Sequence, residues 1–116
     1  MSERVIEVGD KLHIITRRLF EGDVRRHFAG EVIGVSGELH EVQGYAFVFN
    51  PGTNEYKKRP EIRTRIFSPG QEGLIVNKIP REVIIELIEY RMIKQRYLVT
   101  DGKDFFLDIN EFGLTA

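Results

Sequence analysis

Residues 24–49 read VRRHFAGEVIGVSGELHEVQGYAFVF, and this stretch decides the fold class of the chain. Apolar and polar side chains alternate along both of its halves, and the segment GVSG at 34–37 between them is rich in turn-forming residues. Alternation with a period of two is typical of half-buried antiparallel strands. The stretch therefore predicts a hairpin with strands at 24–34 and 39–49.

The same alternation continues on both sides of this hairpin. Further strands are expected at 11–20 and 56–67, and a short one at 73–77. The segments that separate these runs, EG, GVSG, NPGTN and SPGQEG, all contain residues that favour turns. The pattern thus predicts an antiparallel sheet built from consecutive strands.

The pattern changes at residues 80–92, which read PREVIIELIEYRM. Proline can occupy the first helical position, and the apolar residues form one stripe opposite a stripe of glutamates. We expect an amphipathic helix of about three turns here. Ile85 interrupts the polar stripe, which leaves a strand as the alternative. Two apolar runs around Asp101-Gly102 then predict a C-terminal hairpin.

These elements predict a single globular domain over residues 1–116. Its class is α+β and mainly β: a twisted antiparallel meander or open β-barrel of five or more strands, packed against one helix, with a C-terminal hairpin. Hydrophobic residues make up 41% of the chain and charged residues 30%, a balance typical of folded domains. The chain has no cysteine and no apolar run of the roughly 20 residues that a membrane span needs. We expect a soluble cytoplasmic protein that does not contact membranes.

The predicted turns also fix which residues lie opposite one another, and opposite residues share a face of the sheet. With loops at Glu21-Gly22 and Ser36-Gly37, Phe28 lies opposite Tyr45 and Arg26 opposite Phe47. A cation–π contact with Phe47, or a salt bridge to a glutamate of the predicted helix, would hold the guanidinium of Arg26. One face is then apolar, and if the sheet curls into a barrel its aromatic side chains are a candidate ligand pocket: Phe28, Tyr45, Phe47 and Phe49.

The opposite face is expected to be basic, although the net charge of the chain is −1. Its predicted residues are Arg18, Arg25, His27, Lys57, Arg59, Arg63 and Arg65. Such a face could bind nucleic acid or an acidic protein surface. It could also be an ordinary solvated face, or it could receive the acidic helix of a second subunit.

The favoured hypothesis is a non-catalytic binding or assembly module whose basic face meets an anionic partner. The alternative is a small-ligand-binding or catalytic β-barrel with the aromatic pocket. We also expect a homo-oligomer, because the edges of a short sheet must be covered.

Catalytic signatures are missing from the sequence. It contains no GxGxxG, GxSxG, HExxH or Walker-type phosphate loop. The predicted register places His13 and His27 on the order of 10 Å apart, and His40 farther away. The prediction therefore includes no catalytic residue, no metal site and no cofactor.

Overall fold

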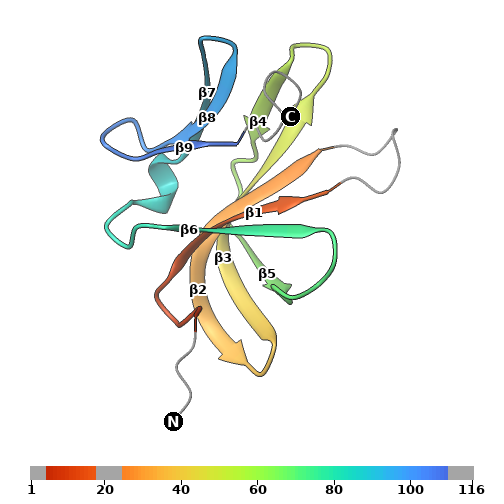
Figure 1. The fold of residues 1–116 in the computed structure, drawn as a ribbon, viewed down its shortest axis with the longest axis vertical. Helices are drawn as coiled ribbons and strands as arrows, with labels where there is room; N and C mark the ends of the chain where they lie inside the picture. The colour runs from red at the N-terminus through yellow and green to blue at the C-terminus, as the bar shows by residue number, and fades with distance from the viewer. Residues whose placement is uncertain (1–4, 18–24, 110–116) are drawn as a thin grey trace.

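The computed structural model describes residues 5–17 and 25–109. Within these residues nine strands form two antiparallel sheets (Figure 1). The larger sheet contains β1 (Lys11–Thr16), β2 (Arg26–Ser36), β3 (Leu39–Asn50), β4 (Glu55–Lys58), β5 (Arg63–Phe67) and β6 (Leu74–Ile79). The smaller sheet contains β7 (Glu89–Ile93), β8 (Arg96–Thr100) and β9 (Phe106–Asp108).

The larger sheet is an open antiparallel sheet in which one strand, β5, lies off the main strand order. Its strand order is β4-β3-β2-β1-β6, and β5 pairs with the same strand, β3, as β4 does. The predicted strand at 56–67 is thus divided into two short strands that share one edge of β3. The mainly β, antiparallel prediction is confirmed, and the described strands do not close into a barrel.

The predicted helix at 80–92 is wrong. Its only helical part is a single 3₁₀ turn, η1 (Ile85–Leu87). Ile84 and Leu87, which the helical stripe would bury, are 46% and 42% exposed. The strand alternative is correct from Glu89 onward, because β7 pairs with β8 around a two-residue turn.

Contacts from other parts of the chain explain why this segment is not helical. In a helix the carbonyl groups accept hydrogen bonds from amides four residues later. Here the ammonium group of Lys11 takes the place of such amides and donates hydrogen bonds to the carbonyl oxygens of Arg81 (2.6 Å) and Val83. The ammonium group of Lys58 donates to the carbonyl oxygen of Glu86 at 2.6 Å. The segment is therefore held against β1 and β4 in an irregular conformation.

The turn after β7 also favours a strand rather than a helix for Glu89–Ile93. Lys94 and Gln95 both have positive φ values, of 51° and 64°. Two consecutive residues with positive φ form the tight turn that best matches the twist of a hairpin. The C-terminal hairpin predicted around Asp101-Gly102 is present as β8 and β9, with Thr100 opposite Phe106.

The predicted register of the first two hairpins is wrong by one residue. Arg26 pairs with Thr16 rather than Arg17, and Phe28 pairs with Ala46 rather than Tyr45. In the second hairpin the turn lies at 37–38, one residue later than predicted, which shifts the pairing next to the turn by two residues. The bulge between Val32 and Gly34 reduces this shift to one residue for the rest of the hairpin. A slip of one residue moves every side chain of a strand to the other face. The third hairpin, in which Phe49 pairs with Tyr56, has the predicted register.

With the observed register both faces of the larger sheet are apolar in the middle. We call them the Phe28 face and the Phe47 face, after the aromatic residue at the centre of each. The buried cluster on the Phe28 face is formed by Leu12, Ile14, Phe28, Val32, Val42 and Ala46. Partly buried Phe67 of β5 and Leu74 of β6 pack on this cluster from the two ends of the strand order. The sheet therefore curls around the Phe28 face.

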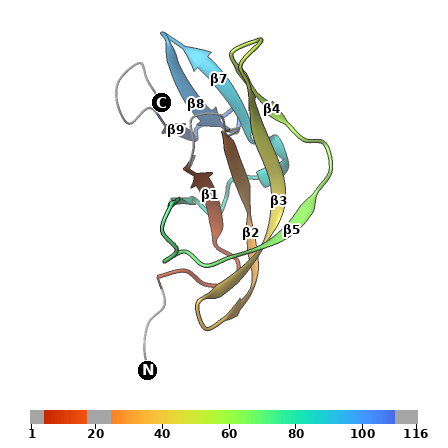
Figure 2. The same ribbon diagram turned by 90° about the vertical axis from the view of Figure 1, so that its right-hand side faces the viewer.

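The smaller sheet covers the Phe47 face. Ala29 and Phe47 from the larger sheet form one buried cluster with Val83, Ile88 and Val99. Figure 1 shows β7, β8 and β9 at the end of the molecule opposite the β2–β3 turn, and Figure 2 shows them beside β1 and β2. The covering layer of the Phe47 face is thus a second sheet, where the sequence predicted a helix.

Two glycines allow the central strands to approach closely. Gly30 of β2 lies directly opposite Gly44 of β3. A Cβ atom added to Gly44 would lie 1.9 Å from the carbonyl oxygen of Ala29 and 2.5 Å from the Cα of Gly30. Both contacts are with backbone atoms, which cannot rotate away. The hairpin therefore requires glycine at this position.

Replacing Gly44 with alanine should destabilise the fold by about 1–3 kcal/mol, because the added methyl group overpacks the β2–β3 backbone. Chemical denaturation monitored by circular dichroism measures this loss. Gly70→Ala is the matched control, because a Cβ there meets nothing within 4 Å, and we expect a change below about 0.5 kcal/mol. Equal stability of the two variants would contradict the register described above.

Candidate functional site

The structure divides the predicted basic face between the two sides of the sheet. Arg25 and His27 lie on the Phe47 face, where the guanidinium of Arg25 stacks over Phe49 at 5.3 Å and His27 pairs with Phe47. Arg63 and Arg65 lie on the Phe28 face, opposite Gly44 and Val42. The prediction that all these residues share one face is wrong, and the one-residue slip in register is the cause. Arg18 lies outside the described residues.

A smaller basic cluster forms on the Phe28 face instead. We call it the four-cation cluster, and its members are Arg26, Lys57, Arg63 and Arg65. Arg26 and Lys57 lie opposite the same β3 residue, Val48, from its two sides. The sequence pattern predicts Arg26 on the apolar face opposite Phe47, but Arg26 lies on the Phe28 face and its side chain is exposed. It is the member that sequence reasoning missed, and the correct register would have found it.

The electrostatic environment of Arg65 shows that it lies close to two other members of the cluster, Arg63 and Arg26. Its guanidinium lies over the Phe28 ring, 5.5 Å from the centroid. The pKa of Arg65 is lowered, first by burial and then by repulsion from Arg63 and Arg26. Among residues 5–17 and 25–109, no carboxylate forms an ion pair with any member of the cluster. The positive charges of the cluster are therefore not neutralised by described carboxylates in contact with them.

Arg59 and the predicted aromatic pocket are arranged differently from expectation. Arg59 lies between β4 and β5, where its side chain approaches Glu61 at 4.0 Å. Phe28 and Phe47 belong to separate buried clusters on opposite faces. Tyr45 and Phe49 are partly buried on the Phe47 face. The four aromatic residues therefore do not line one common cavity.

The Phe47 face contains a buried cluster of two imidazoles and one phenol. Nε2 of His13 and Nδ1 of His27 each lie 2.6 Å from the hydroxyl oxygen of Tyr90. The two imidazole rings are 5.3 Å apart, centre to centre. The predicted separation on the order of 10 Å is thus wrong, because the slip in register places both histidines on one face. His13 is fully buried and His27 is 6% exposed.

The hydrogen bonds of this cluster define its proton positions. A phenol has one proton to donate, so one imidazole must donate to the Tyr90 oxygen and the other must accept from it. Nδ1 of His13 is buried and has no hydrogen-bond partner among the described residues. A buried N–H without an acceptor is rarer than an acceptor without a donor. We therefore assign the proton of His13 to Nε2, which donates to Tyr90, while the Tyr90 hydroxyl donates to Nδ1 of His27.

Burial keeps all three groups of the cluster neutral. Desolvation lowers the pKa of His13 to about 3 and that of His27 to about 4. Repulsion from His27 adds to the effect at His13, and repulsion from Arg25 adds to it at His27. Burial also raises the pKa of Tyr90 well above its usual value. The neutral hydrogen-bond chain joins β1 and β2 of the larger sheet to β7 of the smaller one.

Two further observations concern metal binding and membrane-spanning helices. In the ranges 5–17 and 25–109 no three histidine, aspartate or glutamate side chains gather in a group that could hold a metal ion. Across the same ranges, no helix has the length and apolar character needed to cross a membrane. The four-cation cluster and the His13–His27–Tyr90 cluster are thus the candidate sites of this part of the chain.

Comparison with known protein families, curated proteins and solved structures finds no match for this chain.

Replacing Tyr90 with phenylalanine should destabilise the protein by about 1–3 kcal/mol, because it leaves two buried imidazole nitrogens without their shared partner. Urea denaturation at neutral pH measures the change. Tyr97→Phe is the control, since the Tyr97 hydroxyl donates to the Asn54 carbonyl at an exposed position. A larger loss for Tyr97→Phe than for Tyr90→Phe would contradict the assigned role of the cluster.

Stability should also decrease when the pH falls below about 6.5. The unfolded chain takes up protons on both histidines near their ordinary pKa of 6.5, whereas the folded chain takes them up only near pH 4 and pH 3. The free energy of unfolding is therefore fully retained above pH 6.5 and is progressively lost toward pH 3. Between pH 7 and pH 5 the loss should be roughly 2 kcal/mol for each histidine.

Urea denaturation of the wild type and of His27→Gln at these two pH values checks this dependence. The variant should lose about half as much stability between pH 7 and pH 5 as the wild type does. The carboxyl group of Asp10 does not interfere, because a hydrogen bond from the Glu7 amide lowers its pKa below 3.8. Equal stability of the wild type at pH 7 and pH 5 would disprove the buried, neutral state of the two imidazoles.

Proposed function

We propose that this protein is a non-catalytic binding module that uses the four-cation cluster to contact the phosphate backbone of nucleic acids. The observation that carries the proposal is the gathering of Arg26, Lys57, Arg63 and Arg65 on the Phe28 face without described carboxylate partners. Like charges that are held close together repel one another, and an anion that contacts several of them relieves this repulsion.

The residue types of the cluster favour phosphate as the anion. Three of its four members are arginines, whose planar guanidinium groups can bind a phosphate through two parallel hydrogen bonds. Arg26, Lys57 and Arg63 are exposed, so their side chains can reach a ligand. The cluster spans three strands of one sheet, which gives it the form of an extended surface rather than a single anion pocket.

The backbone is also the part of a nucleic acid that this surface can best contact. Reading of bases in the major groove usually requires an inserted helix or two-stranded ribbon. The only helical element in the described residues is the three-residue turn η1. The aromatic residue next to the cluster, Phe28, is 3% exposed and cannot stack on a base. Binding should therefore depend on charge and show little sequence preference.

The proposal also includes a cytoplasmic setting and self-association. The chain has no cysteine, which is compatible with a reducing compartment. Strand β6 lies at one end of the strand order and, among the described strands, pairs with β1 alone. A strand edge of this kind can pair with a second copy of the chain.

Fluorescence anisotropy with labelled single-stranded and duplex oligonucleotides tests the proposed function. The logarithm of the affinity for single strands should fall with the logarithm of the salt concentration with a slope of about −3, which corresponds to four phosphate contacts. The double variant Lys57→Glu with Arg63→Glu should lose most of the affinity and about half of the slope.

The matched control is Lys94→Glu with Lys103→Glu, which makes the same charge change on the smaller sheet and its loop. This control should bind nearly as well as the wild type. An equal loss of affinity in both double variants would show that only net charge matters. Tighter binding to polyglutamate than to either oligonucleotide would favour an acidic protein as the partner and overturn the proposal.

A further inference from the structure

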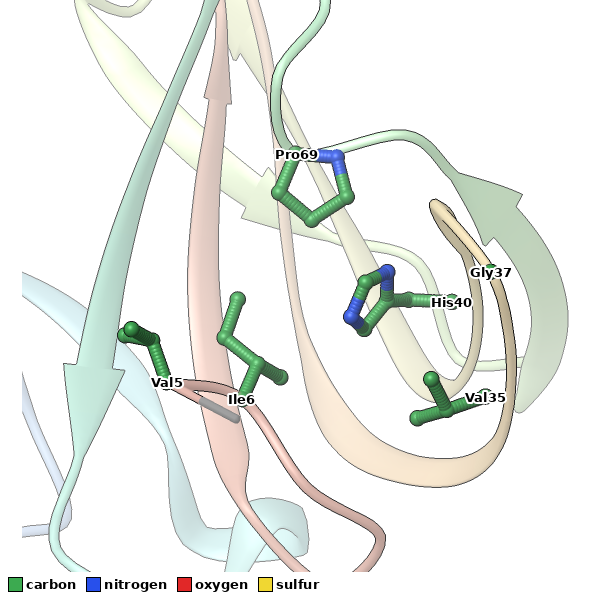
Figure 3. Close-up of a pocket in the computed structure, with 6 residues that line it drawn as sticks. All are labelled: Val5, Ile6, Val35, Gly37, His40 and Pro69. Atoms are coloured by element: carbon green, nitrogen blue, oxygen red, sulfur yellow. The ribbon is translucent and has the colours of Figure 1, made fainter. Parts of the chain in front are cut away.

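A third candidate site is a small cavity next to the β2–β3 turn, which is open to solvent. Its volume is about 300 Å³, and it is lined by Val5, Ile6, Val35, Gly37, His40 and Pro69. These residues come from three separate parts of the chain: the segment before β1, the β2–β3 hairpin and the loop after β5. Figure 3 shows the imidazole of His40 extending from the hairpin into the space between Ile6, Val35 and Pro69.

The hydrogen bonding of His40 leaves one nitrogen available to this cavity. Nδ1 of His40 lies 2.9 Å from the carbonyl oxygen of Glu38. A carbonyl oxygen can only accept, so Nδ1 carries the proton, and Nε2 of the neutral ring is an acceptor. Nε2 has no hydrogen-bond partner among the described residues and is open to solvent, since the fully buried side-chain atoms without a partner in those residues do not include it. In Figure 3 this outer nitrogen of the ring is directed toward Ile6.

The walls of the cavity restrict the charge of a ligand. Val5, Ile6, Val35 and Pro69 are apolar, and the described lining residues include no lysine, arginine, aspartate or glutamate. An anion would find no cation there, and a cation would find no carboxylate. A neutral molecule with an apolar body would bury its surface against these walls.

From these observations we infer that the cavity is a binding site for a small neutral molecule with an apolar body and one O–H or N–H donor. The donor binds Nε2 of His40, and the apolar body lies against Ile6, Val35 and Pro69. This site is separate from the four-cation cluster, and the inference goes beyond the proposed function. Phenol and indole represent the chemical class of ligand that the cavity fits.

Nuclear magnetic resonance titration of the full chain with phenol, anisole and benzoate tests the inference. Anisole replaces the hydroxyl donor of phenol with a methyl ether, which adds one methyl group, and benzoate adds a negative charge. Phenol should shift the Nε2 resonance of His40 and the methyl resonances of Ile6 and Val35. Anisole should bind about tenfold more weakly, because it leaves Nε2 without a partner, and benzoate should not bind.

The variant His40→Phe keeps an aromatic ring in the cavity and removes the acceptor. It should bind phenol and anisole with equal, weak affinity. The comparison of phenol with anisole in the wild type requires no variant, so the inference remains testable if His40→Phe does not fold. Equal affinities of the wild type for the two compounds, tight binding of benzoate, or the absence of any shift at His40 would each overturn the inference.

Discussion

The register of β2 with its two neighbours is the constraint on which the rest of the structure depends. Because side chains alternate between the faces of a sheet, this register decides which residues meet in each buried cluster. It places His13 beside His27, puts Arg26 and Lys57 on the same face on either side of Val48, and separates Phe28 from Phe47. Both candidate sites thus result from the same backbone pairing. Two features stabilise this pairing in one arrangement: the bulge between Val32 and Gly34 and the close approach of the strands at Gly30 and Gly44.

Much of the secondary structure could be predicted from the sequence, whereas the side chains that share each face of the sheet could not. Period-two alternation located the first strands, and the four-residue loop at 51–54 gave the correct pairing of Phe49 with Tyr56. The turn after Ser36 and the bulge near Gly34 have no unambiguous local signal, because several adjacent residues can form either feature. An error of one residue there exchanges the two faces of a strand, so the sequence pattern predicts one basic face from residues that lie on two different faces. The sheet itself was still recognised, because alternation does not depend on register.

The helix prediction failed for a different physical reason. The intrinsic preferences of residues 80–92 favour a helix, but contacts distant in sequence outweigh them. The ammonium groups of Lys11 and Lys58 bind carbonyl oxygens of this segment, and the hairpin that begins at Glu89 pairs its second half with β8. Neither contact is visible in a short sequence window. The sequence does not reveal the buried hydrogen bonds of Tyr90 for the same reason. It predicts a helix at residue 90, whereas Tyr90 lies on β7, which helps to cover the Phe47 face.

The facing glycines of β2 and β3 have a consequence for the evolution of this fold. Neither position can acquire a side chain alone, and a double replacement would bring two methyl groups into the same narrow space. Substitutions elsewhere can accumulate as long as volume and polarity are kept, but drift at these two sites is blocked in every descendant that keeps the strand pairing. Divergent relatives should therefore share this glycine pair after most of their remaining sequence identity has been lost, which makes it a marker for recognising distant homologues.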